Sequence, residues 1–366
     1  MNTWNEPLSG DGKVINWINF LFNKRIKRLA AKETMPSELE IVNASKILFS
    51  VFGRYGDSVI AFKIIKEFID RYPNKKYVLI TTHQLFPYAE RILGPSTVEM
   101  YHINKRKNII RLWTVISMLK RNPMDVGFNP LCNGADSQFF ITFARKFSFY
   151  NVFSLKKAAQ RGNRAINFYN RVREYLLLPE KSFFCNGAKI AGGKNVLICP
   201  FSTDKKKNMD ILSLKKLCAQ ICKSYPQAKI TIAVTADEKL QDLKELEFRQ
   251  FIFKKNLATS KNFLALLEGI DLFFGVDSGP LHLATALGIP SIGIFGPGAP
   301  EIIIDPASKI VPIRYEKMKG YFCERRKCEN PICIYHLFDD DIFAYRVELD
   351  SKLPIRYESD RCPMLL

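Results

Sequence analysis

The chain has 366 residues, 47% of them hydrophobic and 25% charged, with a formal net charge of +19. This length favours two domains over a single core, and the composition is typical of a globular protein. No apolar run reaches the roughly 18 residues of a membrane span, and the first residues lack the pattern of a signal peptide. We therefore expect a cytoplasmic protein whose charge attracts an anionic partner: nucleic acid, an anionic membrane or a phosphorylated substrate.

Residues 1–45 form a basic extension ahead of the first predicted strand. Its apolar residues recur at helical spacing, and the segment from Lys13 to Lys32 contains no acidic residue. The apolar stripe consists of Val14, Trp17, Ile18, Leu21, Phe22, Ile26 and Leu29. Two interpretations stay open: a helix packed on its own protein, or a basic amphipathic helix on an anionic membrane surface. The second would make the protein peripheral on the cytoplasmic face of the inner membrane.

From Lys46 onward, β-rich apolar runs alternate with helical patterns, which favours parallel βαβ units. A first α/β domain is expected over residues 46–180, with strands at "KILFSVF", "KYVLITT", "TVEMYHI", "DVGFNP" and "FSFYNVF". The Pro- and Gly-containing stretch at residues 176–194 suits a linker. A second domain follows over residues 190–345, with strands at "NVLICPF", "AKITIAV", "DLFFGV" and "PSIGIFG", and residues 346–366 form a tail.

The stretch "FFGVDSGPLHLATALGIPSIGIFGP" joins a buried strand to a helix. Asp277 and Ser278 fall at the carboxyl end of that strand, where open α/β sheets bind ligands. Gly279 permits close backbone approach, and a proline follows at the first helical position. The free amides of this helix start form an anion site, which His282 can face one turn further on. The alternative is an ordinary helix start, with Ser278 as N-cap and His282 on the surface.

Two further loops follow strands in the same way. In "FGRYGDS", Gly53 and Gly56 allow a tight turn, and Asp57 begins a helix either as a plain N-cap or as a general base. The GxGxxG spacing of dinucleotide-binding enzymes is absent. In "PFSTDKKKNMD", hydroxyls and cations are available to a diphosphate leaving group, although a lysine run is also common on solvated surfaces. These groups are Ser202, Thr203, Lys205, Lys206 and Lys207.

Most of the nine cysteines fall in predicted strands and helices, which fits reduced thiols in a reducing compartment. Cys323, Cys328 and Cys333 are spaced five apart, and Cys362 follows later. Four thiolates could bind zinc or iron, but the spacing is not the CxxC pair of structural zinc sites. Reduced structural cysteines are the preferred interpretation and a metal site the alternative.

The three loops together resemble glycosyltransferase family 9, the lipopolysaccharide heptosyltransferases. "GVDSGPLHLATALGIPSIGIFGP" is similar to the family signature, "ILFSVFGRYGDSVIAFKIIKEFIDRYP" to its opening strand, turn and helix, and "VLICPFSTDKKKNMDILSLKKL" to its donor-phosphate loop. The resemblance runs from about Lys46 to Pro300. It implies a GT-B architecture, with two Rossmann-like domains and parallel sheets facing a central cleft. It also implies metal-independent transfer of heptose from ADP-heptose with inversion.

The resemblance implies a role for particular residues. Asp57 would be the general base, and Arg54 could contact an anionic acceptor. The donor would be bound by Ser202, Thr203, Lys205, Lys207, Asp237, Glu238, Asp277, Ser278, Gly279 and His282. The chain departs from the family at the opening turn, which is usually rich in serine, and after the lysines, where the family has Trp-Pro.

The resemblance gives an expected function: transfer of a sugar to an anionic, lipid-linked lipopolysaccharide or lipooligosaccharide core, with no cofactor. Three alternatives stay open: another nucleotide sugar, a protein or capsule acceptor, or nucleotide-sugar binding without turnover. No zinc finger, RNP motif or basic helix-turn-helix supports a nucleic-acid partner, so none is expected.

Overall fold

In the computed structural model, the described residues are 12–104, 109–131, 134–149, 167–182, 193–233, 251–254, 260–325, 328, 331–349, 355–358 and 362–365. Contacts divide the chain into two units. The first comprises Met1–Arg54, Ala61–Ser154 and Val172–Leu178, and the second comprises Tyr55–Ile60, Leu155–Arg171 and Pro179–Leu366. Each unit is built around its own parallel sheet, which confirms the predicted α/β class.

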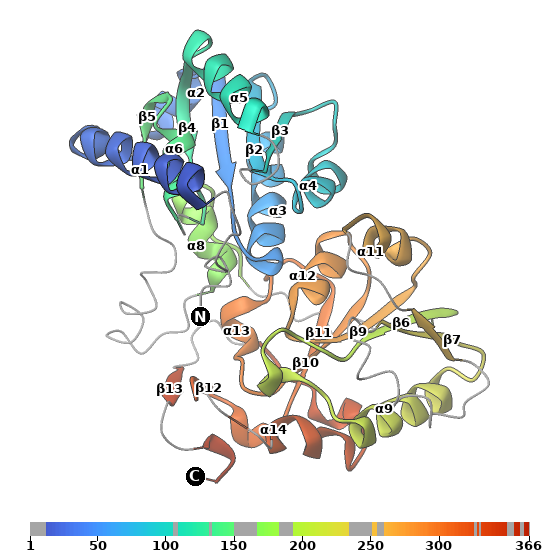
Figure 1. Ribbon diagram of the computed structural model, residues 1–366. Coiled ribbons are helices and arrows are strands. Elements are labelled where there is room, and N and C mark those ends of the chain that lie inside the picture. Colours follow the sequence, from blue (N-terminus) through green and yellow to red (C-terminus); the bar gives the residue numbers. More distant parts are fainter. Residues whose placement is uncertain are drawn as a thin grey trace. The chain divides into compact units, whose positions relative to one another are not determined.

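The sheet of the first unit has five parallel strands in the order β3-β2-β1-β4-β5 (Figure 1). They are β1 (Lys46–Val51), β2 (Lys76–Thr82), β3 (Glu99–Ile103), β4 (Met124–Phe128) and β5 (Ala144–Phe147). Phe49 of β1 is paired with Leu79 on one side and Phe128 on the other. The last strand differs from the expectation, because "FSFYNVF" begins where β5 ends.

Helices cover this sheet on both faces. In chain order they are α1 (Gly12–Leu29), α2 (Glu38–Asn43), α3 (Tyr55–Arg71), α4 (Phe86–Leu93), α5 (Ile109–Arg121), α6 (Ala135–Ile141) and α8 (Phe168–Tyr175). Residues of α1, α5 and α6 share one apolar cluster with strand residues such as Leu48 and Ile80. Because the strands of this sheet are all parallel, their carboxyl ends lie at the same end of the sheet, where α3 begins.

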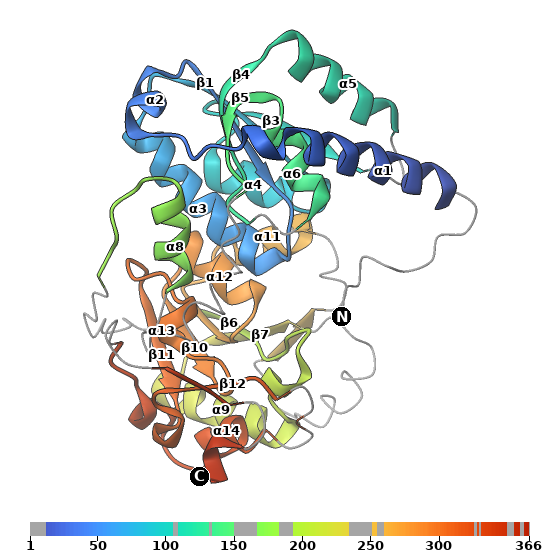
Figure 2. The same ribbon diagram turned by 90° about the vertical axis from the view of Figure 1, so that its left-hand side faces the viewer.

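The basic extension forms helix α1, and one of its faces packs on the first unit (Figure 2). Phe22 stacks on Phe139 of α6 with 3.7 Å between ring centroids, and Ile18 is buried beside it. Arg25 donates to the hydroxyl and carbonyl oxygens of Thr142 at 2.7 and 3.0 Å. The interpretation as a helix packed on its own protein thus holds for this face. No helix among the described residues is long and apolar enough to cross a membrane.

The sheet of the second unit has six parallel strands in the order β11-β10-β9-β6-β7-β8. They are β6 (Asn195–Cys199), β7 (Lys229–Ala233), β8 (Phe251–Lys254), β9 (Leu272–Val276), β10 (Ser291–Phe295) and β11 (Ile310–Arg314). Its helices are α9 (Ile211–Ser224), α11 (Ser260–Leu267), α12 (Gly279–Ala286) and α13 (Pro300–Ile303), with a 3₁₀ turn at Lys205–Lys207. All five residues of β9 are buried, which explains their unbroken apolar sequence.

The chain end, which the sequence pattern left unassigned, adds short elements to the second unit. They are β12 (Tyr321–Cys323), β13 (Arg356–Glu358), α14 (Ile332–Tyr335) and 3₁₀ turns at Glu316–Met318, His336–Phe338, Ile342–Tyr345 and Pro363–Leu365. Residues Ile334, Leu337 and Phe338 join the core of the six-stranded sheet. The domain boundaries predicted from the sequence stay a prediction.

Candidate functional site

Asp277 follows directly on β9, at the carboxyl edge of the six-stranded sheet. Its amide donates to the carbonyl of Ile294 at 3.2 Å, so the strand pairing fixes its position. The side chain is only 6% exposed. A Cβ on Gly298 would lie 2.7 Å from Oδ2 of Asp277, so the absence of a side chain there makes room for the carboxylate. A charged group this buried requires a partner of opposite charge.

Lys207 supplies that partner. Its Nζ lies 2.5 Å from Oδ2 of Asp277, and both side chains are largely shielded from water. The 3₁₀ turn that carries Lys207 follows β6, the strand next to β9, so neighbouring strand ends bring the two charges together. Of the lysines predicted to hold phosphate, Lys207 is therefore the one that lies at Asp277.

The other residues of this loop have different environments. Lys206 donates to the carbonyls of Cys323 and Arg325 at 3.2 Å each, which ties the loop to β12. The hydroxyl of Ser202 accepts from the amide of Asp204 at 3.3 Å and shapes the turn. Thr203 and Lys205 are exposed to solvent. One lysine thus lies at the carboxylate, one anchors the loop and one faces water.

Helix α12 begins next to Asp277, and its first turn contains an uncommitted hydroxyl. Ser278 occupies the N-cap position, yet its side chain accepts no hydrogen bond from the helix. Its Oγ is buried and has no hydrogen-bond partner among the described residues. The interpretation of Ser278 as an ordinary N-cap is therefore wrong, because the usual N-cap bond is missing. The hydroxyl is available to an anionic group at this helix start, whereas the amides of Leu281 and His282 donate to the carbonyl of Ser278.

His282 is buried one turn into α12, not on the surface. Its Nε2 lies 3.8 Å from Oδ1 of Asp277, beyond hydrogen-bond distance, and the ring of Tyr169 lies 6.4 Å away between centroids. Burial lowers the pKa of His282, and the Lys207 cation lowers it further, while Asp277 and Asp305 act in the opposite direction. The lowered pKa favours the uncharged ring, which suits a hydrogen-bonding role over charge neutralisation.

The first turn of α3 belongs by its contacts to the second unit. Gly56 lies so close to α12 that a Cβ there would be 3.2 Å from Cδ2 of His282, and one on Gly279 would be 3.3 Å from the amide nitrogen of Gly56. Both glycines thus allow two helix starts to approach. Asp57 lies in this first turn but is not the N-cap, since that position is held by Arg54, an exposed residue whose side chain makes no capping bond.

Arg314, at the carboxyl end of β11, was not among the site residues predicted from the sequence. It is 1% exposed, and its Nη2 donates to the carbonyl of Tyr321 at 2.5 Å. Its Nε and Nη1 have no partner among the described residues. Burial lowers the pKa of Arg314 to about 10, while the carboxylates of Glu301 and Asp277 oppose the shift. An arginine that ends the apolar run "IVPI" was the available signal, by the same strand-end argument that found Asp277.

Asp237 and Glu238, predicted to bind the donor, lie outside the described residues. The structure therefore brings together Lys207, Asp277, Ser278, Gly279 and His282, with Asp57 one residue beyond the contact made by Gly56. It leaves Lys205 and Thr203 facing solvent.

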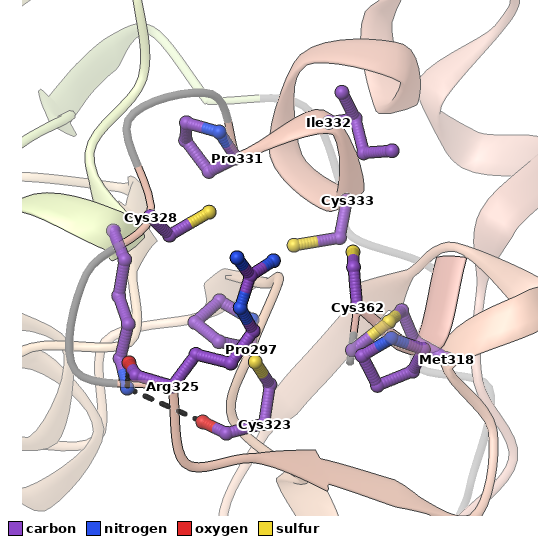
Figure 3. Close-up of a pocket in the computed structure, with 11 residues that line it drawn as sticks. Pro297, Met318, Cys323, Arg325, Cys328, Pro331, Ile332, Cys333 and Cys362 are labelled. Carbon is purple, nitrogen blue, oxygen red and sulfur yellow. Dashed lines mark hydrogen bonds between the residues drawn. The ribbon is translucent and has the colours of Figure 1, made fainter. Parts of the chain in front are cut away.

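The four clustered cysteines line one small cavity behind this site, with a volume of about 10 Å³. Figure 3 shows the thiols of Cys323, Cys328, Cys333 and Cys362 directed toward it from separate segments. Burial raises the pKa of Cys333 to about 12, and the neighbouring thiols act in the same direction. Lys206 also lines the cavity, so the cluster adjoins the lysine loop. The described residues contain no group of three or more His, Cys, Asp or Glu arranged to hold a metal.

Comparison with known proteins gives a family match for the second unit. Residues 157–331, which include β6 to β11 and the α12 start, match glycosyltransferase family 9 (heptosyltransferase). This match assigns residues 157–331, just under half of the chain, to that family. Lipopolysaccharide heptosyltransferase 1 of Campylobacter coli is 34% identical over 108 residues, which are 28% of this chain and 32% of the relative. The match thus spans about a third of that relative's length.

Solved structures show the same fold at low identity. The glycosyl transferase family 9 protein of Veillonella parvula has a TM-score of 0.55 and 14% identity, with 74% of this chain and 86% of that chain covered. The ADP-heptose lps heptosyltransferase II of E. coli has a TM-score of 0.54 and 15% identity, with coverage of 74% and 90%. The GT-B class expected from the resemblance is confirmed.

Proposed function

We propose that this protein is an inverting glycosyltransferase that moves heptose from ADP-heptose to a lipopolysaccharide or lipooligosaccharide core. The observation that carries the proposal is the paired charge of Lys207 and Asp277 beside the uncommitted hydroxyl of Ser278 at the start of α12. This arrangement suits a ligand that has both a diphosphate and several hydroxyls. ADP-heptose is such a ligand, and the family description and the Campylobacter coli relative both name heptosyl transfer.

The proposed donor site assigns a task to each group. The positive end of the α12 helix dipole and the Lys207 ammonium neutralise the diphosphate as it leaves, without a metal ion. Asp277 accepts hydrogen bonds from donor hydroxyls and holds Lys207 in place when the site is empty. The neutral imidazole of His282 contributes a hydrogen bond. Asp237 and Glu238 are proposed to bind the adenosine ribose, on the strength of the family resemblance alone.

Asp57 is proposed as the general base. Its carboxylate takes the proton from the acceptor hydroxyl, whose oxygen then attacks the anomeric carbon from the face opposite the diphosphate. The bond between that carbon and the diphosphate oxygen breaks, and its electron pair leaves with ADP. Because the attack comes from the face opposite the leaving diphosphate, the configuration at the anomeric carbon inverts. The contact of Gly56 with Gly279 and His282 supports this assignment, since Asp57 follows Gly56 directly.

The acceptor is proposed to be anionic and linked to lipid, with Arg54 contributing to its binding. Arg54 is exposed at the end of the loop that follows β1. A nucleotide-sugar donor also places the reaction on the cytoplasmic side of the inner membrane.

A donor screen tests the substrate. Purified protein is incubated with a heptose-deficient core acceptor and with ADP-heptose, or with UDP- and GDP-sugars in parallel, and the extracted glycolipid is analysed by mass. We expect a mass increase of one heptose with ADP-heptose. A clear preference for a UDP- or GDP-sugar would refute the heptose assignment, and nucleotide-sugar binding without any product would favour a binding protein.

The base has a matched control on its own helix. Asp57→Asn keeps size and polarity but removes the base, so we expect transfer to fall by about 10²-fold or more. Asp70, near the other end of α3, is exposed and pairs with Lys66 four residues away. Because such surface pairs contribute little, Asp70→Asn should transfer at the wild-type rate. Wild-type-like turnover by Asp57→Asn would remove Asp57 from the mechanism.

A further inference from the structure

Helices α1 and α5 of the first unit expose large apolar side chains on the same part of its surface. Ile110 is 81% exposed, Phe20 59% and Trp17 54%, and Ile109 and Trp113 are also exposed. The rings of Trp17 and Trp113 lie 6.4 Å apart between centroids, so residues nearly a hundred positions apart form one surface. We call these five residues the α1–α5 patch.

The patch is not a sign of loosely attached helices. The opposite face of α1 is buried through Ile18 and Phe22, and that of α5 is buried through Leu112, Val115 and Leu119. These residues belong to one core cluster with the five-stranded sheet. Both helices are therefore held in place by their inner faces. Their outer faces present two tryptophans and a phenylalanine that no described residue covers.

Charge on the same helices is strictly one-signed. Neither Gly12–Leu29 nor Ile109–Arg121 contains an acidic residue. The exposed basic side chains lie toward the carboxyl ends of the two helices: Lys24, Lys27, Arg28, Lys120 and Arg121. Along α1 the outer face runs from Trp17 through Phe20 to Lys24, at the spacing of one helix face. The surface thus combines aromatic residues with a basic border.

We propose that the α1–α5 patch docks on an anionic phospholipid bilayer. Tryptophan and phenylalanine next to lysine and arginine is the side-chain set that binds at the headgroup boundary of such membranes. Lysine and arginine near the surface add attraction to anionic lipid. A second copy of this chain fits less well, because a symmetric contact would bring two basic borders together. Nucleic acid fits less well too, because duplex binding does not require exposed Ile109, Ile110 and Trp113.

The docking rests on the proposed function in one respect: a lipid-linked acceptor lies in a membrane, so an enzyme that acts on it must bind there. The proposed docking also changes the membrane interpretation of the N-terminal helix α1. The extension does not dock by its apolar stripe as a whole, since Ile18 and Phe22 face the protein. Docking instead uses the outer face of α1 together with α5, a helix that the sequence pattern did not connect with membranes.

The test measures vesicle binding of the full chain without donor or acceptor. Wild type is mixed with vesicles of pure phosphatidylcholine or of phosphatidylcholine with phosphatidylglycerol, and co-sedimentation is measured. We expect binding to the phosphatidylglycerol vesicles only, with a blue shift of tryptophan emission, since the patch holds two of the chain's three tryptophans. The double variant Ile110→Ser with Trp113→Ser should weaken binding by about ten-fold or more, and so should Lys24→Gln with Lys27→Gln.

The control replaces exposed apolar side chains by serine elsewhere on the first unit. Leu39 and Val42 of α2 are 69% and 53% exposed, so Leu39→Ser with Val42→Ser should bind vesicles like wild type. Thermal melts check that all variants fold. Wild-type vesicle binding by both the Ile110/Trp113 and the Lys24/Lys27 double variants would overturn the proposal, as would equal binding to pure phosphatidylcholine. A patch variant that lost self-association in ultracentrifugation while vesicle binding stayed unchanged would identify a dimer face instead.

A second measurement separates docking from catalysis. Transfer to a delipidated, water-soluble core acceptor should be unchanged in the patch variants, because the patch is not part of the proposed site. Vesicle binding without any transfer would refute the proposed function and leave the docking intact. Transfer without any vesicle binding would support the proposed function and overturn the docking.

Discussion

At the scale of single residues, the three neighbouring lysines show how one charge acquires a distinct role. Lys206 is fixed to two backbone carbonyls, and Lys205 is exposed. Only Lys207 lies at a buried carboxylate, at 2.5 Å from Asp277. The pair holds the ammonium at the start of α12 before any ligand arrives. A cation positioned in this way stabilises a leaving diphosphate without reorganisation at the moment of transfer.

This difference gives a prediction for matched substitutions in one turn. Lys207→Met should lower kcat/KM for the nucleotide-sugar donor by about 10²-fold, the order lost with one preorganised charge. Lys205→Met should remain near the wild-type value, since the side chain faces water. Steady-state kinetics with a fixed acceptor measures both.

The control for Lys207 concerns folding. Removing the lysine leaves Asp277 buried without its partner, which destabilises the fold as well as the site. Lys207→Arg keeps the positive charge and should recover part of both stability and activity. Equal losses in Lys205→Met and Lys207→Met would mean that the run acts only as a diffuse positive surface.

At the scale of elements, the sequence predicted the strand-end loops better than the chain end. The apolar run of β9 followed by Asp277 was recognisable because a fully buried parallel strand has no polar positions. Arg314 also ends a strand, but cysteines, aromatics and charges follow closely and obscured the periodicity there. β5 was misplaced because aromatic residues continue beyond its end at Phe147. The choice of Lys207 over Lys205 was beyond sequence reasoning, since a 3₁₀ turn decides which side chain faces Asp277.

The sequence analysis grouped the four cysteines as a possible metal site, but their spacing did not show that Cys362 reaches the same cavity from the last residues of the chain. Their sulfurs pack behind the lysine loop, where Cys323 and Cys333 are buried. Cys333 also touches the backbone of the signature loop, since a Cβ on Gly296 would lie 3.1 Å from its Sγ. The cluster therefore packs against the loops of the proposed donor site.

We expect these thiols to be reduced and structural. Cys333→Ser should lower the free energy of unfolding by about 1–3 kcal/mol, because it buries a hydroxyl in an apolar cluster. Cys222→Ser, at a half-buried thiol on α9, should cost less. Urea denaturation measures both. Metal analysis of protein purified without chelator tests the alternative: stoichiometric zinc or iron, with a lower Tm after chelation, would establish a metal site.

At the scale of the whole molecule, the net charge of +19 is open to two explanations that differ in their dependence on salt. Binding through charge alone weakens steeply as salt rises, because each phosphate contact releases counterions. Binding through the α1–α5 patch has an apolar part that salt does not screen. The distribution of apolar residues therefore matters as much as the sum of charges.

We expect the two partners to separate when salt is raised. At about 0.15 M salt, where charges on the surface are screened beyond about 8 Å, a generic DNA duplex should not be retained, whereas phosphatidylglycerol vesicles should still bind. Fluorescence anisotropy of a labelled duplex and co-sedimentation of vesicles measure both in the same buffers. Ile110→Ser with Trp113→Ser should make vesicle binding more sensitive to salt, because the apolar part of the contact is reduced. Duplex binding that persists at this salt concentration would instead show that the basic surface binds nucleic acid. The net charge would then no longer support membrane binding.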